Sequence, residues 1–398
     1  MEFFAVGWLV VLIAAAEGAP ERAALYLGIL GLARAIPAVL LGLVAGVFVD
    51  RIDRRVLLIV CHAIFGLTFG GLGLATLTGN APLWVVLVAG ALYAATSVLY
   101  VPTRQAIQAR LVGERDLPSA IGFVGMSLNA YGFIGPLLGG LLIIPFGAGG
   151  VMLISGLAQL PVIAALTFLR PYPVAGVGPR TGVGRSVADG LRYVRSQPVL
   201  FWLLVAYGAN LFLVDPYADL LPAFTSEVLR MGPTELSWLI AAASVGSLVA
   251  SLTVASVRGL QRFPFLTTGA LVLGGLLLAL FVRQRDIATL LLVAGGIGFA
   301  TIFAGASLNL ILQTTTPDHM RGRVSSLSNL LVDAGSPIGA VLLGLVATAI
   351  GIDQALGAAG LVLAAICVAV GLRPAVMRVR PPASPPATAE PSSAASDG

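Results

Sequence analysis

Two long apolar runs flank a dense group of charges near the start of the chain. Residues 56–77 contain no Asp, Glu, Lys or Arg, and residues 23–49 contain only Arg34. Between the runs, five of the six residues from Asp50 to Arg55 are charged. A helix needs roughly 20 apolar residues to cross the hydrocarbon core of a bilayer. Since the charges must stay in water while both flanks lie in lipid, the pattern predicts two transmembrane helices joined by a short loop.

The rest of the chain repeats this pattern, so we predict an all-α membrane protein. Of its 398 residues, 58% are hydrophobic and only 10% are charged, whereas soluble domains are roughly 25% charged. A membrane β-barrel would show alternating segments of about ten residues, but the apolar segments here are long and unbroken. We predict twelve transmembrane helices, at residues 2–17, 23–48, 56–78, 82–103, 119–144, 149–169, 199–222, 234–257, 263–283, 287–313, 324–350 and 353–372.

The arginines predict which side of the membrane each loop faces. All 23 basic residues are arginine; Arg34 lies within a helix, and only Arg22, Arg230, Arg283 and Arg285 lie in the loops opposite the charged group at 50–55. The other eighteen lie on the side of that group. Because positive loops stay in the cytoplasm, we expect a multi-pass protein of the bacterial inner (cytoplasmic) membrane with both termini in the cytoplasm. No basic segment precedes the first apolar stretch, so no cleavable signal peptide is expected.

The longest connection between the predicted helices divides them six and six. It predicts an N-terminal six-helix bundle at 1–170, a cytoplasmic linker at 171–198 and a C-terminal six-helix bundle at 199–373. Within the linker, residues 186–199 carry apolar side chains on one helical face and arginines elsewhere, which indicates an interfacial amphipathic helix. The Pro-, Ala- and Ser-rich tail, 374–398, is expected to be a disordered cytoplasmic tail.

The two halves resemble each other at a shift of 204 residues. Asn129 then meets Asp333, and Gly140 meets Gly344. This suggests two parallel halves related by an axis along the membrane normal. The same shift leaves the first helix one to two turns short of its counterpart, so we expect the natural N-terminus to lie upstream of Met1.

The charged group also resembles a loop signature of the major facilitator superfamily of secondary transporters. In that family the loop is a latch that stabilises one access state, and an Asp there can sit at the N-terminus of a neighbouring helix, where the helix dipole favours an anion. Asp53 stands where the family has a glycine, and we expect it to pair with Arg54 or Arg55 and weaken the latch. The alternative is a plain topology signal. The matching residues are Gly46, Asp50, Arg51, Arg54 and Arg55.

The fifth predicted helix resembles the antiporter motif of the same superfamily. Small residues would let this helix pack tightly, and its proline would break one backbone hydrogen bond. Tyr131 stands where the motif has its central glycine. The resemblance implies an exchanger that exports its substrate. The matching residues are Gly122, Gly135, Pro136, Gly139 and Gly140.

Two further stretches resemble the drug-efflux branch that includes macrolide exporters and the enterobactin exporter. Residues 101–106, with 117–120, are similar to the loop after the fourth helix there, and residues 317–324 are similar to the loop before the eleventh. We assign Arg104, from the first of these stretches, to the predicted latch. The resemblance implies the twelve-helix major facilitator fold and alternating access.

Ionisable residues inside spans are rare and usually functional, so they are the candidates for the substrate and proton pathway. Asp215 and Asp219 are predicted to lie one turn apart on one face of the seventh helix, where two carboxylates repel each other. We hypothesise that one of them exchanges a proton with substrate; the alternative is that both face the external mouth, Asp219 more readily because it lies just before Pro222. Asp333 and Asn129 are expected to line the seam between the halves. Arg34 is expected to neutralise Asp333 or Asp215, or to form a structural salt bridge.

We therefore predict a secondary active transporter rather than an enzyme, one that exports amphipathic, drug-like small molecules by proton antiport with alternating access. The sequence contains no nucleotide-binding motif, metal-ligand cluster or nucleophile triad, so no cofactor, metal or nucleic-acid partner is expected. The expected partners are a small-molecule substrate, protons and membrane lipid, and the chain is expected to be a monomer. The alternatives are an exporter of a native metabolite such as a siderophore, a lipid flippase, and a carrier-like protein that does not transport.

Overall fold

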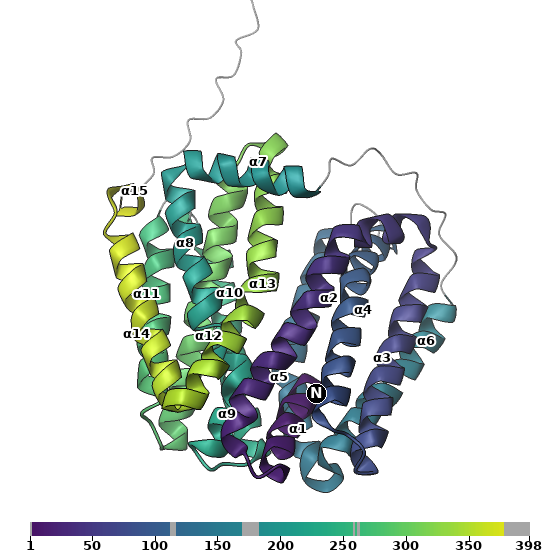
Figure 1. The fold of residues 1–398 in the computed structure, drawn as a ribbon. Coiled ribbons are helices and arrows are strands. Elements are labelled where there is room, and N and C mark those ends of the chain that lie inside the picture. Colours follow the sequence, from purple (N-terminus) through teal and green to yellow (C-terminus); the bar gives the residue numbers. More distant parts are fainter. Residues whose placement is uncertain (1, 112–116, 169–182, 258, 261–262, 378–398) are drawn as a thin grey trace, which may run out of the picture.

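The computed structural model describes residues 2–111, 117–168, 183–257, 259–260 and 263–377 (Figure 1). Apart from short turns, these residues form helices, and no strand occurs among them. The helices are α1 Glu2–Ala16, η1 Pro20–Arg22, α2 Ala23–Arg51, α3 Arg54–Leu77, α4 Leu83–Leu111, α5 Leu117–Leu157, α6 Gln159–Thr167, α7 Val183–Ser196, α8 Pro198–Leu213, α9 Tyr217–Glu227, α10 Pro233–Ser256, α11 Pro264–Phe281, α12 Ile287–Thr315, α13 Asp318–Ile350, α14 Ile352–Gly371 and α15 Pro374–Met377.

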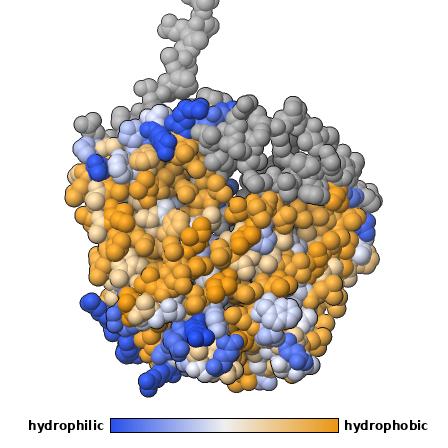
Figure 2. Space-filling view, viewed as in Figure 1, coloured by the Kyte–Doolittle hydropathy of each residue, from blue (hydrophilic) through white to orange (hydrophobic). Residues whose placement is uncertain are grey.

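The helices are those of a membrane protein, as predicted. Ten apolar segments of the described chain are long enough to cross a bilayer, and Phe4–Ala16 is a shorter apolar helix. Figure 2 shows a broad apolar surface between two hydrophilic ends. Large apolar side chains such as Leu67, Phe168 and Leu292 are more than three-quarters exposed in the structure. A surface of this kind is stable in contact with lipid chains, because burying it in them removes it from water.

The chain is broken at two turn-forming positions, one that the sequence predicted and one within a predicted helix. α5 contains a break at Gly147, which has a φ of 65°, a value that glycine adopts at little energetic cost. The sequence predicted the turn between the fifth and sixth helices at this point. The predicted seventh helix is divided into α8 and α9 around Val214–Pro216. Its predicted end at Pro222 was wrong, because α9 continues through that proline to Glu227.

The long helices form two groups that meet along two seams. In Figure 1, α2, α3, α4 and α6 lie on one side, α8 and α10–α14 lie on the other, and α1, α5 and α9 lie between them. Across the boundary, α2 packs against α13 and α5 packs against α10. A shift of 204 residues relates α5 to α13 and α2 to α10, so the two seams use corresponding helices. This arrangement agrees with the predicted pseudosymmetric major facilitator fold.

Glycines bring the helices together at both seams. A Cβ on Gly28 of α2 would lie 2.7 Å from the carbonyl oxygen of Ala340 in α13, and one on Gly344 would lie 2.8 Å from that of Ala24. At the other seam, a Cβ on Gly140 of α5 would overlap the Ser237 side chain of α10. Small residues allow this backbone proximity, which is a principal source of helix association in membranes.

The amphipathic linker helix is α7, which begins and ends three residues earlier than predicted. It lies across the end of the second group, against α13 and α8 (Figure 1). The Asp189 carboxylate accepts a hydrogen bond from the Arg323 guanidinium of α13 at 3.0 Å and pairs with Arg192 at 3.2 Å. Residues 169–182 and the tail beyond Met377 lie outside the described residues, so the predicted domain limits and the disordered tail remain predictions.

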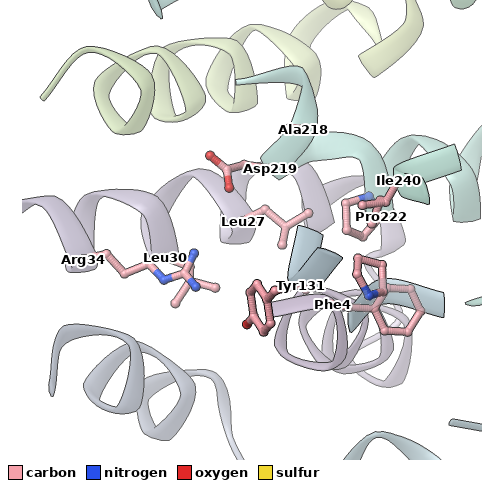
Figure 3. Close-up of a pocket in the computed structure, with 11 residues that line it drawn as sticks. Phe4, Leu27, Leu30, Arg34, Tyr131, Ala218, Asp219, Pro222 and Ile240 are labelled. Atoms are coloured by element: carbon pink, nitrogen blue, oxygen red, sulfur yellow. The ribbon is translucent and has the colours of Figure 1, made fainter. Parts of the chain in front are cut away.

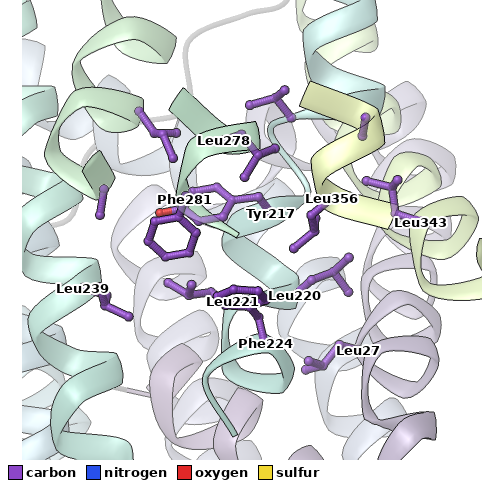
Figure 4. Packing of buried hydrophobic residues seen from close by; sticks show 14 of the residues in the cluster. Leu27, Tyr217, Leu220, Leu221, Phe224, Leu239, Leu278, Phe281, Leu343 and Leu356 are labelled. Atoms are coloured by element: carbon purple, nitrogen blue, oxygen red, sulfur yellow. The ribbon is translucent and has the colours of Figure 1, made fainter. Parts of the chain in front are cut away.

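α9 is buried in the hydrophobic core. Tyr217 and Phe224 project from α9 onto Phe281 of α11, with ring centroids 5.6 and 5.4 Å apart, and Leu220 and Leu221 are also buried (Figure 4). This packing holds the short helix α9 in place although the chain is broken before it. The packing around α9 therefore helps to position Asp215 and Asp219, which lie just before and at the start of this helix.

Candidate functional site

The break between α8 and α9 gives two acidic residues different surroundings. The backbone N–H groups of Val214 and Asp215 both donate to the carbonyl oxygen of Asn210, at 2.9 Å each, which ends α8. Pro216 has no N–H to continue the ladder and begins the next turn. Asp215 thus lies between the helices, whereas Asp219 lies in the first turn of α9, where the helix dipole favours a negative charge.

Asp219 and Arg34 are the two charged residues among the described side chains that line the cavity of the site. They attract each other electrostatically, and both line a cavity of about 340 Å³, here called the central cavity. In Figure 3 the two side chains project into the same space from α9 and α2, with Tyr131 on its border. The other walls are apolar and come from α1, α2, α5, α9 and α10. The sequence proposed Asp215 or Asp333 as the partner of Arg34; the Asp333 side chain lies outside those described, so that proposal stays a prediction, and the shared cavity with Asp219 is the added finding.

Asp215 has another partner. Its carboxylate is hydrogen-bonded to the Ser336 side chain of α13, and it also interacts electrostatically with Asp219. The sequence predicted that the two aspartates lie on one face of a continuous helix. That prediction was wrong, because the chain is broken between α8 and α9. Asp215 belongs to the contact between α8 and α13, whereas Asp219 faces the central cavity. Of the two, Asp219 therefore has the geometry of a group that can meet both a proton and a substrate.

A second cavity, here called the aromatic cavity, adjoins the first. It has a volume of about 410 Å³ and is lined by residues of α3, α4, α5 and α6, including Phe65, Tyr93 and Tyr100. Tyr131 belongs to the walls of both cavities. A third space of about 470 Å³ between α2, α4 and α13 shares Arg34 with the central cavity and Tyr93 with the aromatic cavity. The three cavities are therefore neighbours, because they share Arg34, Tyr93 and Tyr131 as wall residues.

The charged loop contains two structural contacts that its resemblance to a latch did not suggest. The Asp53 carboxylate accepts hydrogen bonds from the backbone N–H groups of Arg55, at 2.8 Å, and Val56, at 3.3 Å, and so caps the N-terminus of α3. The Arg55 guanidinium donates to the carbonyl oxygens of Leu166 and Thr167 at the end of α6. Asp53 is therefore a helix cap, and Arg55 stabilises carbonyl groups that α6 leaves without a helical partner.

We predict that Asp53→Ala destabilises the protein by ~1 kcal/mol, because two N–H groups at the start of α3 lose their acceptor. Asp53→Asn retains a side-chain oxygen and should stay close to the wild type. Thermal unfolding of the purified variants in one detergent checks this. Equal midpoints for the alanine and asparagine variants would show that the cap contributes nothing.

Arg104 and the motif glycines occupy defined positions. The Arg104 guanidinium lies over the Tyr100 ring, 5.8 Å from its centroid, and lines the aromatic cavity; its assignment to the latch stays a prediction. Gly135, Gly139 and Gly140 are buried on α5, and Pro136 lines the central cavity. The seam contact of Gly140 agrees with the tight packing expected of this motif.

Several predicted residues cannot be placed to the level of their side chains. Asn129 lies on α5 and Asp333 on α13, at the helices of the two seams. Their expected contacts, like those of the first part of the latch, lie outside the described side chains. Among described residues, no group of three or more His, Cys, Asp or Glu is arranged to hold a metal ion. The residues in question are Gly46, Asp50, Arg51, Gly122, Asn129 and Asp333.

Comparisons with known proteins agree with the fold and the motifs. A family described as transmembrane secretion effector matches residues 1–391. The multidrug efflux pump Tap of Mycolicibacterium fortuitum is 28% identical, over 83% of this chain and 82% of its own. The enterobactin exporter EntS of Shigella flexneri is 27% identical, over 76% and 72%. The macrolide efflux protein A of Streptococcus pyogenes is 23% identical, over 84% and 83%.

Among solved structures, a bacterial homolog of the human lysosomal transporter Spinster, in an inward-facing and unoccupied conformation, is similar in fold. Its TM-score is 0.70 at 15% identity, and the similarity covers 93% of this chain and 94% of that chain. The predicted resemblance to the drug-efflux branch, with its macrolide and enterobactin exporters, is confirmed.

Proposed function

The chain belongs to the transmembrane secretion effector family of the major facilitator superfamily, and from this we propose that it exports amphipathic, drug-like small molecules in exchange for protons. Its relatives support export: their names describe efflux pumps and an exporter. The observation that carries the exchange mechanism is the Arg34–Asp219 pair in an otherwise apolar cavity between the two groups of helices. Such a pair is a usual mark of a proton pathway in a membrane protein.

In the proposed cycle, Asp219 alternates between pairing with Arg34 and holding a proton. Protonation from outside removes the attraction to Arg34, and the two bundles then rock about the central cavity. On the cytoplasmic side, substrate entering the cavity displaces the proton, and the Arg34–Asp219 pair forms again. The apolar part of the substrate would pack against the apolar walls of the cavity. We place the protein, as a monomer in lipid, in the bacterial cytoplasmic membrane with both termini inside.

Expression in a bacterial host that lacks its own drug pumps tests this function. We expect increased resistance to amphipathic drugs, lost when an uncoupler collapses the proton gradient. In proteoliposomes, an imposed pH gradient should drive drug transport, and drug movement should in turn move protons. Drug transport that persists without a proton gradient would contradict proton exchange while leaving export intact.

Export of a native metabolite is the second candidate, since one relative is named as an exporter of enterobactin. The metabolite would bind in the same central cavity and would be exported by the same exchange for protons. Under this function, deletion of the gene should impair growth only when iron is limiting, and drug resistance should not change. Transport of a labelled lipid in proteoliposomes, with neither drug nor metabolite moved, would instead indicate a flippase.

A further inference from the structure

We propose that the aromatic cavity is a substrate subsite for a planar aromatic group that carries an anionic oxygen. The inference rests on the proposed function only for calling the ligand a substrate; binding itself can be measured without transport. The cavity volume of about 410 Å³ lies within the range of small-molecule sites, roughly 300–1,000 Å³.

The aromatic walls of the cavity are held in place by one another. Phe65 lies 5.2 Å from Tyr93 and 5.6 Å from Tyr100, measured between ring centroids, and His62 meets Tyr100 edge-on at 5.3 Å. His62 Nδ1 is also 2.7 Å from the Gln159 side-chain oxygen on α6. Rings fixed in this way form a preformed slot, and aromatic pairs prefer such offset and edge-on arrangements.

The charge of the cavity selects an anion. Arg104 contributes a permanent positive charge, and the described residues that line the cavity include no Asp or Glu. The Nε–H of Arg104 and the hydroxyl of Ser97 are buried without a hydrogen-bond partner among the described residues. Buried polar groups of this kind are normally satisfied, so a ligand oxygen that accepts hydrogen bonds at this wall would stabilise both the ligand and the protein.

Tyr131 connects this subsite to the proton site. It occupies the position of the central glycine in the antiporter motif, and its side chain borders both the aromatic and the central cavity. A substrate whose ring occupies the aromatic cavity can therefore extend past Tyr131 toward Arg34 and Asp219. A glycine would leave the two cavities without this shared wall.

Isothermal titration of the purified full-length protein with three matched probes tests the proposal. The probes are 1-naphthoate, its neutral amide 1-naphthamide, and the cation 1-naphthylmethylammonium. We expect naphthoate to bind about tenfold more tightly than the amide, because a hydrogen bond to a charged group is stronger than a neutral one, and the cation to bind most weakly. Equal binding of the three probes, or no binding by any, would overturn the proposal without use of a variant.

Two arginine variants locate the effect. Arg104→Gln should remove the preference for naphthoate over naphthamide, whereas Arg104→Lys, which keeps the charge, should retain part of it. Arg373→Gln is the matched control, because Arg373 also lies over an aromatic ring, that of Trp202 at 4.5 Å, but does not line the aromatic cavity. A preference that survives Arg104→Gln, or that Arg373→Gln removes equally, would overturn the proposal. Naphthoate binding without proton-driven transport would support this inference and contradict the proposed function.

Discussion

Asp219→Asn is expected to reduce proton-driven export by more than about tenfold. An asparagine cannot carry the proton, and it removes the negative charge that attracts the Arg34 guanidinium across the central cavity. Breaking a fully buried ion pair costs about 3–5 kcal/mol, and the half-buried position of both side chains reduces that cost here. The measurement is drug efflux from energised cells, normalised to the amount of protein in the membrane.

A second variant separates the structural role of the pair from the proton role. Arg34→Gln combined with Asp219→Asn removes both charges, so it should restore the amount of folded protein while export remains uncoupled from protons. Asp215→Asn is the control for Asp219→Asn, because the new amide can still hydrogen-bond to Ser336. We expect it to lose less proton-driven export than Asp219→Asn. Wild-type coupling in Asp219→Asn would eliminate Asp219 as the proton carrier; a larger loss in Asp215→Asn would transfer that role to Asp215.

Gly140→Ala is expected to abolish most transport although it adds only one methyl group. The new Cβ would overlap the Oγ and Cβ atoms of Ser237, so α5 and α10 would have to separate at their seam. Overpacking of this kind costs roughly 1–3 kcal/mol in a well-packed core. In a transporter this cost destabilises the conformation in which α5 and α10 are packed together. Gly140→Ala should therefore shift the balance of access states as well as lower the stability of the protein.

The partner residue provides the decisive control for this prediction. After Ser237→Gly, the nearest remaining atom to the Gly140 Cβ is the Pro233 carbonyl oxygen at 3.4 Å, which is ordinary contact. Gly140→Ala with Ser237→Gly should therefore recover transport. Gly71→Ala on α3, where a new Cβ meets nothing within 4 Å, should have no effect. If the double variant stays inactive, Gly140 serves some purpose other than this contact.

The fold was predictable because hydrophobic length is encoded locally. Segments such as 56–78 and 287–313 could be assigned to helices from the sequence, and the end of the fifth predicted helix before Gly147 agrees with the backbone behaviour of glycine. The break before Pro216 was not predicted, because the apolar run continues through it. The end of α9 was not predictable in the same way. Pro222 signals the end of a helix in isolation, but the buried packing of Leu220, Leu221 and Phe224 keeps the helix intact through it.

The candidate site was predictable only as a set of residues. A charge within a span is visible in the sequence, so Arg34, Asp215 and Asp219 could all be selected. Which of them meet could not be derived, because α2 and α9 are far apart in the chain and the break before α9 turns Asp215 toward Ser336. Asp53 is the opposite case: its capping role depends only on backbone N–H groups two and three residues later in the chain, and a search for helix N-caps could have found it.

By itself, the sequence determined that this chain is a bundle of membrane helices, because each span must satisfy its own backbone hydrogen bonds in lipid. It also determined the family, through motifs that lie within single loops and helices. Only the tertiary structure decided that Arg34 and Asp219 line one cavity, that Gly140 avoids an overlap with Ser237, and that an aromatic cavity lies beside Arg104. These features join helices distant in sequence, and their geometry depends on how the helices pack, which no local pattern specifies.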